Sequence, residues 1–329
     1  MNECKKEKRG RDFNFVYCDN WLNNNLPDKC AKLLIADPPY FEVEGEFDFI
    51  WKSFNDYLKD VEKWAIECKR VLADNGTLFW WGMDRKIAYS QIILDKYFNL
   101  VSTPVWEKPS NANEWDTRTS FPERAAERLL MYSSKNEQDA FKNIMEYFNI
   151  ERKKIGWNYI QCDDFLNIKA SYCYWDKPTT HDYVMCSKEN YMKLQTTGYW
   201  QKDYDIIRAE FLKAKRVFDN KFKLNDVLRF SRANNNYEHD TKKPEKLTRA
   251  LILTCSRKDD LVVVPFAGSG TECAMSAKEG RNFIGFDIEQ KHVNTSNRRC
   301  FEILRQPQLF CKNQGAVAFF FTDEPDKLD

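Results

Sequence analysis

Four consecutive residues near the N-terminus carry groups that could bind and orient an amine: Asp37, Pro38, Pro39 and Tyr40. The Asp37 carboxylate and the Pro38 backbone carbonyl are hydrogen-bond acceptors, which suit the two hydrogens of an amino group. The two prolines fix φ at successive positions and so pre-organise both oxygens. Tyr40 adds an aromatic face for a planar ring. The simpler alternative is a turn in which Asp37 accepts only local backbone hydrogen bonds.

A glycine-rich segment near the other end of the chain could bind a nucleoside. It consists of Pro265, Phe266, Ala267, Gly268, Ser269, Gly270 and Thr271. Glycines there let the backbone approach a ligand closely at the start of a helix. Asp287 follows 17 residues after Gly270, near the distance at which an acid commonly binds ribose hydroxyls. The segment alone also fits a dinucleotide, because both kinds of cofactor carry a ribose.

Both segments directly follow apolar runs, Leu33–Ala36 and Leu261–Val264. Runs of this length and composition predict buried strands. Open α/β sheets bind their ligands at the carboxyl ends of such strands. We therefore expect Asp37 and the glycine-rich segment to lie at one edge of a sheet.

The remaining pattern alternates strands with helices, which predicts a doubly wound α/β sheet. Helical spacing of apolar residues predicts helices over 51–72, 87–98, 271–278 and 294–304. Further strands are expected over 15–18, 77–81, 100–106, 128–132 and 282–286. Regular strand patterns cease after Ser134 and resume near Leu261.

The order of the two motifs resembles the β class of DNA amino-methyltransferases, which use S-adenosylmethionine (S-adenosyl-L-methionine) to modify exocyclic amines. In that family the Asp-Pro-Pro-Tyr tetrapeptide comes first, a target-recognition region follows, and the Phe-x-Gly-x-Gly cofactor loop comes last. The resemblance covers about residues 13–135 and 237–304. It implies a Rossmann-like, mixed, mostly parallel seven-stranded sheet. The sheet would be circularly permuted, with the catalytic half first and a mainly helical recognition domain inserted.

The resemblance also implies the domain boundaries and the residue roles. Residues 1–135 would form the catalytic half, 136–236 the recognition domain, 237–310 the cofactor half and 311–329 a tail. The tetrapeptide would be catalytic, and the whole glycine-rich segment would bind the cofactor. Further cofactor-binding residues would be Asp19, the His-x-Thr-x-Lys-Pro residues His239, Thr241 and Lys243, and Asp287. Val264 departs from the family, which commonly has an acid there that contacts the cofactor's methionine part.

Bulk properties set limits on the partners. The 329-residue chain has a net charge of +1 and 43% hydrophobic residues, which are typical of a folded soluble protein. It contains no apolar run of membrane-spanning length, and its first residues lack the apolar core of a signal peptide. The three histidines lack metal-ligand spacing, so no metal is expected. We expect a cytoplasmic protein of prokaryotic or phage origin with no membrane partner.

The charge distribution favours double-stranded DNA as the partner. Between Lys142 and Arg232 there are 17 Lys and Arg residues against 12 Asp and Glu. Lys188, Lys193 and Arg232 are candidate DNA contacts, although ordinary solvated lysines would give the same pattern. A homodimer and a cognate restriction endonuclease are left open.

Several activities compete for this pattern. In the resembled family, Asp rather than Ser at position 37 favours adenine N6 as the target, and cytosine N4 is the nearest rival. Protein-glutamine and RNA methyltransferases generally have the opposite motif order and an Asn-Pro-Pro-Tyr. A catalytically inactive DNA-binding partner usually lacks one of the motifs that this chain keeps. A nicotinamide-dependent oxidoreductase leaves the tetrapeptide unexplained.

Overall fold

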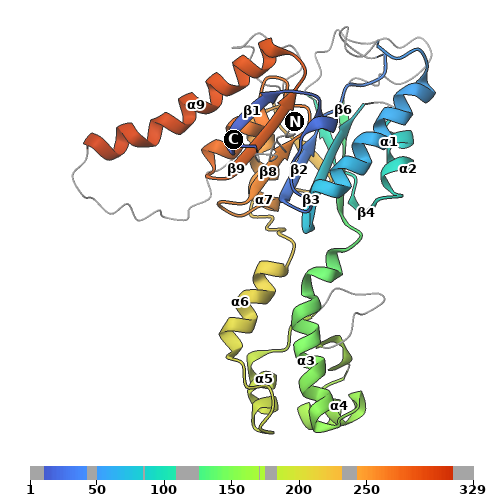
Figure 1. Ribbon diagram of the computed structural model, residues 1–329, viewed down its shortest axis with the longest axis vertical. Helices are drawn as coiled ribbons and strands as arrows, with labels where there is room; N and C mark the ends of the chain where they lie inside the picture. Colours follow the sequence, from blue (N-terminus) through green and yellow to red (C-terminus); the bar gives the residue numbers. More distant parts are fainter. Residues whose placement is uncertain are drawn as a thin grey trace, which may run out of the picture. The chain divides into compact units, whose positions relative to one another are not determined.

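The computed structural model of the chain describes residues 11–42, 50–83, 86–108, 126–169, 171–174, 184–231 and 243–313. The chain forms two units (Figure 1). The first, called here the sheet unit, consists of Met1–Ser134 and Val217–Asp329, and the second, called here the helical unit, is Lys135–Arg216.

A nine-stranded sheet, counted over the described residues, organises the sheet unit. Its strands are β1 (Phe15–Cys18), β2 (Ala31–Ala36), β3 (Leu72–Gly82), β4 (Phe98–Ser102), β5 (Val105–Glu107), β6 (Ala126–Ser134), β7 (Val227–Arg229), β8 (Leu261–Val264) and β9 (Asn282–Asp287). They lie in the order β1-β9-β8-β2-β3-β6-β5-β7, and β4 pairs with β6. The part of this order from β1 to β6 can be followed in Figure 1.

The sheet is mixed and mostly parallel, as predicted. Neighbouring strands from β1 to β3 are parallel, as are β5 and β7, whereas β6 is antiparallel to β3, β4 and β5. The predicted number of seven strands is wrong. The expected strand over 100–106 is two strands, β4 and β5, which pair with different parts of β6. In addition, β7 joins the sheet from within the expected recognition domain, 136–236.

Helices cover both faces of the sheet. The helices α1 (Phe54–Val71) and α2 (Ile87–Leu94) share one apolar cluster with Leu34 and Ala36 of β2. The other cluster joins Leu33 and Ile35 of the same strand to α7 (Glu245–Cys255), α8 (Thr271–Lys278) and α9 (Gln290–Asn313). Because successive side chains of a strand point to opposite faces, a continuous apolar run supplies both cores.

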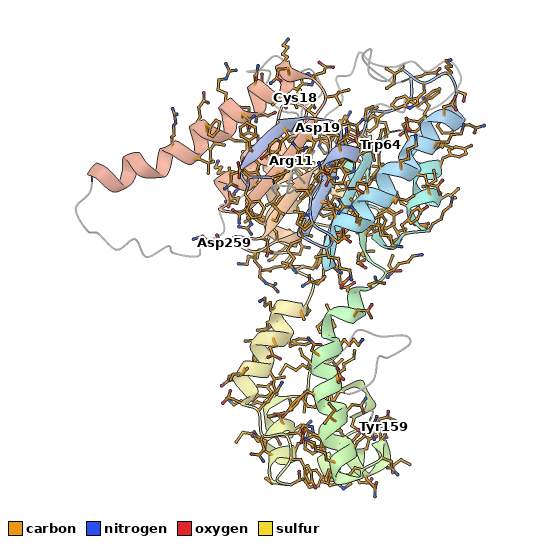
Figure 2. All side chains as sticks on the ribbon, viewed as in Figure 1. Arg11, Cys18, Asp19, Trp64, Tyr159 and Asp259 are labelled. Carbon is orange, nitrogen blue, oxygen red and sulfur yellow. The ribbon has the colours of Figure 1, made fainter. Side chains whose placement is uncertain are left out.

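The helical unit contains α3 (Lys142–Ile155), α4 (Tyr159–Leu166), α5 (Lys188–Gln195) and α6 (Tyr204–Ala214). Two 3₁₀ turns, Glu137–Phe141 and Ser171–Tyr174, complete its described part, in which no strand occurs. Tyr159, labelled in Figure 2, begins α4. Phe148, Tyr191 and Trp200 are fully buried in the unit's own apolar cluster.

The boundaries of the helical unit differ from the expected 136–236 at one end. The unit begins at Lys135 but ends at Arg216. The following residues belong to the sheet unit because β7 pairs with β5 and the Asp219 N–H donates to the Thr254 carbonyl at 2.8 Å. At the far end, α9 reaches Asn313, within the expected 311–329 tail. No helix in the described part of the chain is long and apolar enough to span a bilayer.

Candidate active site

The carboxyl ends of β2 and β8 lie next to each other in the sheet. The two strands are parallel, with Leu33 opposite Val262 and Leu34 opposite Val263. Asp37 therefore leaves the sheet at the same edge as Pro265, as the sequence predicted. The sheet thus brings the tetrapeptide and the glycine-rich segment together although they are far apart in the chain.

Both oxygens of the Asp37 carboxylate accept hydrogen bonds. The Tyr40 hydroxyl donates to Oδ1, and Nζ of Lys243 donates to Oδ2 at 2.6 Å. Burial, with the nearby Asp37 charge, raises the pKa of Tyr40 well above its ordinary value, so its hydroxyl stays a donor. The Asp37 side chain is 27% exposed. Because each carboxylate oxygen has two lone-pair sites, Asp37 can still accept a hydrogen bond from a ligand.

Side chains of β9 and α9 hold the glycine-rich segment in place through hydrogen bonds. The Gly268 N–H donates to Oδ2 of Asp287 at 2.8 Å, and the Ser296 hydroxyl donates to the Gly268 carbonyl at 2.8 Å. The Arg299 guanidinium donates to the Ser269 carbonyl at 2.6 Å. These bonds fix the loop between β8 and α8 against β9 and α9.

Gly270 is needed for both conformation and space. Its φ of +74° is in the left-handed region, which favours glycine. A Cβ atom at this position would lie 2.6 Å from Cβ of Ser296 on α9. The loop and α9 therefore approach too closely for a side chain at this position.

Asp19 lies at the same edge as Asp287, since β1 pairs with β9 and Cys18 is opposite Asp287. Arg11 forms an ion pair with the Asp19 carboxylate, and both are labelled in Figure 2. Burial alone would raise the pKa of Asp19, but hydrogen bonds, above all from Arg11, hold it below its ordinary value. Asp19 is therefore ionised near the loop.

The backbone N–H groups of the loop and the acidic side chain beside them suit a cationic nucleoside better than a pyrophosphate. The N–H groups of Ala267, Gly268 and Gly270 donate to groups of the chain, so they are not directed at a phosphate. Glu272, in the first turn of α8, is only 7% exposed, and no ion pair joins its carboxyl to another described side chain. When it is ionised, a buried carboxyl at this helix start repels an anion and attracts a cation.

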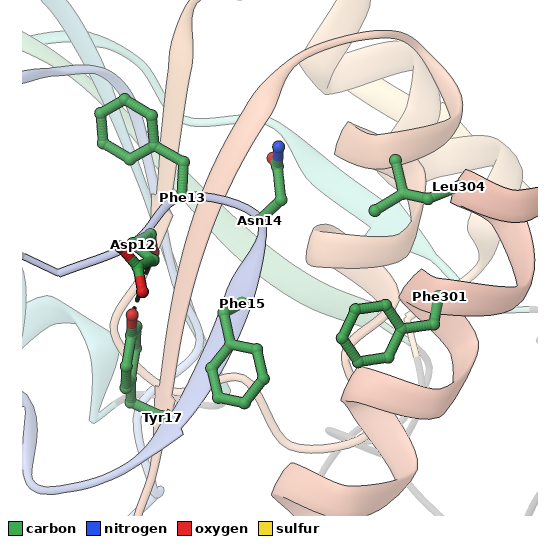
Figure 3. Close-up of a pocket in the computed structure, with 7 residues that line it drawn as sticks. All are labelled: Asp12, Phe13, Asn14, Phe15, Tyr17, Phe301 and Leu304. Carbon is green, nitrogen blue, oxygen red and sulfur yellow. Dashed lines mark hydrogen bonds between the residues drawn. The ribbon is translucent and has the colours of Figure 1, made fainter.

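A separate hollow of about 340 Å³ lies between β1 and α9 (Figure 3). The rings of Phe15 and Phe301 lie next to each other there, with centroids 6.4 Å apart and planes tilted by 57°. None of the predicted site residues lines this hollow. Among the described residues, no group of three His, Cys, Asp or Glu side chains is placed to hold a metal.

A comparison with protein families agrees with this geometry. The model of the DNA methylase family, N6_N4_Mtase, matches residues 31–298, which include Asp37, the glycine-rich segment and Asp287. The chain belongs to this DNA methylase family.

Curated relatives of the methylase are bacterial enzymes. Type II methyltransferase M.HinfI of Haemophilus influenzae is 25% identical over 86% of this chain and 66% of its own length. The match therefore spans slightly less than two thirds of that relative. Type II methyltransferase M2.MboI of Moraxella bovis is 25% identical over 90% of both chains. DNA adenine methyltransferase YhdJ of Escherichia coli K12 is 25% identical over 83% of this chain and 77% of its own.

Solved structures share the methylase fold. A DNA modification methylase from Thermus thermophilus, complexed with S-adenosyl-L-methionine, matches with a TM-score of 0.50 at 16% identity. The match covers 88% of this chain and 95% of that one. PvuII DNA methyltransferase, which is cytosine-N4-specific, matches with a TM-score of 0.52 at 14% identity over 88% and 91% of the two chains.

Several residues or contacts of the methylase site were not found from the sequence, and some predicted residues are not described. Lys243, expected to bind the cofactor, contacts Asp37, a pairing that the sequence did not indicate. Ser296 and Arg299 brace the loop, but no local motif distinguishes them from other polar residues of a helix. The predicted site residues His239, Thr241 and Arg232 lie outside the described residues.

The candidate DNA contacts of the methylase have acidic neighbours in the helical unit. Nζ of Lys188 lies 3.3 Å from Asp205, and Nζ of Lys193 lies 3.2 Å from Glu189. The basic excess is also smaller within the structural boundaries, because residues 135–216 hold 14 Lys and Arg against 12 Asp and Glu. Charge alone therefore argues less for DNA binding by this unit than the sequence indicated.

Glu272 makes the stability of the methylase depend on pH. Burial, with the nearby Asp37 charge, raises the pKa of Glu272 from 4.5 to about 7. A carboxyl with a raised folded-state pKa stabilises the fold most below its unfolded pKa, and this contribution is lost as the pH rises through about 7. We expect Glu272→Gln to raise the free energy of unfolding at pH 8.5 by up to about 3 kcal/mol, and at pH 5 by less than about 1 kcal/mol.

Urea unfolding at the two pH values measures this difference. Glu302→Gln, at an exposed position of α9, serves as the control and should change neither value by more than about 0.5 kcal/mol. A gain from Glu272→Gln that is equal at both pH values would contradict the raised pKa.

Proposed function

We propose that the chain is an S-adenosylmethionine-dependent DNA methyltransferase that modifies adenine N6. The observation that carries the proposal is the position of Asp37 and the braced glycine loop at one edge of the sheet. The cofactor would bind there beside the glycine loop, and the target amine would bind beside Asp37. A base must leave the duplex to reach such a site.

The tetrapeptide binds the target amine. One N–H of the amine donates to the Asp37 carboxylate and the other to the Pro38 carbonyl. With both hydrogens engaged, the nitrogen lone pair is directed away from these two acceptors and becomes nucleophilic. S-adenosylmethionine, when bound, supplies an activated methyl group on a sulfonium. The acceptors are fixed before the base arrives, which favours the transition state electrostatically.

The loop and its acids bind the cofactor. Asp287 keeps lone pairs for ribose hydroxyls while its two oxygens hold the Gly268 and Glu289 N–H groups at 2.8 and 2.9 Å. Asp19, at the end of the neighbouring strand, supplies a second ionised carboxylate on the nucleoside side. These acids suit a cationic cofactor and disfavour the pyrophosphate of a nicotinamide dinucleotide.

Adenine is the proposed target rather than cytosine because position 37 is Asp and not Ser. The likeness to YhdJ, which is named an adenine methyltransferase, supports the same choice. Cytosine N4 is the second candidate, since the same two acceptors would hold its amino group and PvuII DNA methyltransferase shares the fold. An inactive DNA-binding partner is disfavoured because Asp37 and the loop are both intact.

Sequencing native DNA from a methylation-free host that expresses the chain tests the proposal. We expect N6-methyladenine in one sequence context, and none in a host that expresses Asp37→Asn. N4-methylcytosine would select the second candidate. Unmodified DNA, together with no binding of S-adenosylmethionine by the purified protein, would contradict the proposed function.

The helical unit is proposed to recognise the DNA sequence, with Lys188 and Lys193 contacting phosphates. Arg232, beyond the end of this unit, is proposed as a third phosphate contact. We expect Lys188→Gln with Lys193→Gln to weaken DNA binding and to reduce the slope of log affinity against log salt by nearly one unit for each lost phosphate contact. Binding assays from low to moderate salt measure the slope.

A matched control is available in α1. Lys59 and Lys63 are likewise exposed and lie 2.9 and 2.8 Å from aspartates of the same helix. Their double replacement by Gln should leave the slope unchanged. Equal slopes for the wild type and the Lys188 and Lys193 variant would exclude these two lysines from the DNA-facing surface.

A further inference from the structure

The ammonium group of Lys243 lies between two carboxylates. Nζ is 2.6 Å from Oδ2 of Asp37 and 2.9 Å from Oε2 of Glu127. The side chains of Lys243 and Glu127 are only 5% and 8% exposed. Water therefore screens the pair between these two residues only weakly.

Glu127 has a second cationic neighbour. Nζ of Lys108 lies 2.5 Å from Oε1 of Glu127, and the Lys108 side chain is 16% exposed. Charges thus alternate along a row of four residues, which we call the charge row: Asp37, Lys243, Glu127 and Lys108. Burial alone would raise the pKa of Glu127, but the two ammonium groups hold it below its ordinary value.

The Lys243 ammonium is also fixed by its surroundings. It lies 5.1 Å from the ring centroid of Trp81 and 5.8 Å from that of Tyr40. Burial would lower the pKa of Lys243, but the Asp37 and Glu127 carboxylates hold it above its ordinary value. Lys243 therefore remains charged, and it donates a hydrogen bond to Asp37 while forming an ion pair with Glu127.

Sharing changes what Lys243 does to Asp37. If the Lys243 ammonium were paired with Asp37 alone, it would attract the Asp37 carboxylate more strongly. The carboxylate would then be a weaker hydrogen-bond acceptor for any other donor. Glu127 takes part of that interaction and sets the direction from which Nζ approaches. Asp37 is then oriented, and it still has lone pairs for a substrate.

We propose that Glu127 is a positioning residue for methyl transfer, acting through Lys243 to aim the Asp37 carboxylate at the target amine. The inference rests on the proposed function, because it needs Asp37 to bind that amine. It gives Glu127 a role in the reaction although it has no contact with Asp37 in the charge row. Lys108 supports Glu127 from the other side.

Glu127→Gln in the full-length chain tests the inference by single-turnover methylation. A carboxylate displaced by a fraction of an ångström binds the amine less well, so we expect a loss of about ten- to a hundredfold in rate. Affinity for S-adenosylmethionine, measured by calorimetry, should change less than about twofold. Glu279→Gln is the matched control, because Glu279 is 15% exposed and pairs with Arg249 at 2.6 Å outside the charge row. It should keep the wild-type rate.

The pH profile gives a readout that a structural role would not change. Glu127→Gln leaves the whole Lys243 charge on Asp37, so the acid limb of the rate should move to lower pH. Lys243→Met removes that charge, so the acid limb should move to higher pH. Identical acid limbs in the wild type and in Glu127→Gln would overturn the inference.

A double variant separates positioning from folding. Glu127→Gln with Lys108→Gln removes one charge of each sign and leaves the pair of Lys243 with Asp37. We expect its thermal stability to exceed that of Glu127→Gln while its rate stays low. Recovery of rate and stability together would show that Glu127 only maintains the fold. A wild-type chain that methylates no DNA would instead contradict the proposed function, and the inference with it.

Discussion

Replacement of Asp37 by Asn is expected to reduce the rate of methyl transfer by on the order of a hundredfold or more, because it removes a charged acceptor that is fixed before the base arrives. The asparagine side chain would keep one carbonyl oxygen and nearly the same volume, so the fold should be preserved. Asp37→Ala should be at least as inactive. It also leaves the buried Lys243 ammonium with Glu127 as its remaining carboxylate in the charge row, which adds a cost in stability.

Single-turnover methylation of DNA with saturating S-adenosylmethionine measures this effect. Cofactor affinity should be nearly unchanged, since the loop is braced by Asp287, Ser296 and Arg299 and not by Asp37. Asp74→Asn is a suitable control, because Asp74 is 21% exposed and also pairs with a lysine, Lys29, at 2.9 Å. Retention of most activity by both Asp37 variants would contradict the role of Asp37 in catalysis.

The position of Asp37 and the glycine loop at one edge of the sheet could be predicted from the sequence, because it depends on short local patterns of residues. Two short apolar runs, Leu33–Ala36 and Leu261–Val264, indicated buried strands, and buried parallel strands present their carboxyl ends at one edge. The length of α8 was predicted for the same kind of reason, with a glycine loop before it and Gly280 after it.

The charge row could not be predicted because its pairs depend on packing between distant elements. Lys243 and Asp37 are 206 positions apart, and nothing local in either segment indicates the other. Glu127 occupies a strand, where an acid usually signals exposure, yet it is 8% exposed between two lysines. Glu272 shows the same difficulty, because an acid in the first turn of a helix is favourable on the surface as well.

The predicted number of strands was wrong for a different physical reason. β7 has three residues, Val227–Arg229, which is too short to show alternation above chance. It forms because β5 offers it a parallel partner, with Trp106 opposite Leu228. Its pairing assigns the residues after Arg216 to the sheet unit and so moves the boundary of the helical unit.

Replacement of Gly270 by Ala is expected to lower cofactor affinity by about tenfold or more. The new Cβ would lie 2.6 Å from Cβ of Ser296, so the loop must move away from α9. The left-handed φ of +74° adds strain of about 1–2 kcal/mol, and overpacking typically costs a further 1–3 kcal/mol. Both effects displace the backbone that is proposed to approach the cofactor.

Gly280→Ala separates strain from the clash. Gly280 has a similar φ of +70°, but a Cβ there would meet only Lys258 atoms at 3.5 Å or more. We expect a stability loss of about 1–2 kcal/mol from strain, with cofactor affinity unchanged. Calorimetric titration with S-adenosylmethionine and urea unfolding of both variants give the two quantities.

A second substitution on α9 should decide whether contact with Ser296 causes the loss of affinity. Ser296→Gly removes the side chain against which a Cβ at position 270 would press, whereas Ser296→Ala keeps its Cβ and removes only the hydroxyl that donates to the Gly268 carbonyl. Combined with Gly270→Ala, we expect Ser296→Gly to recover part of the cofactor affinity and Ser296→Ala to recover none. Equal affinities for the two double variants would mean that the Ser296 side chain does not cause the loss, which would leave the left-handed φ and the Ser296 Cα, 2.9 Å from the new Cβ, as its causes.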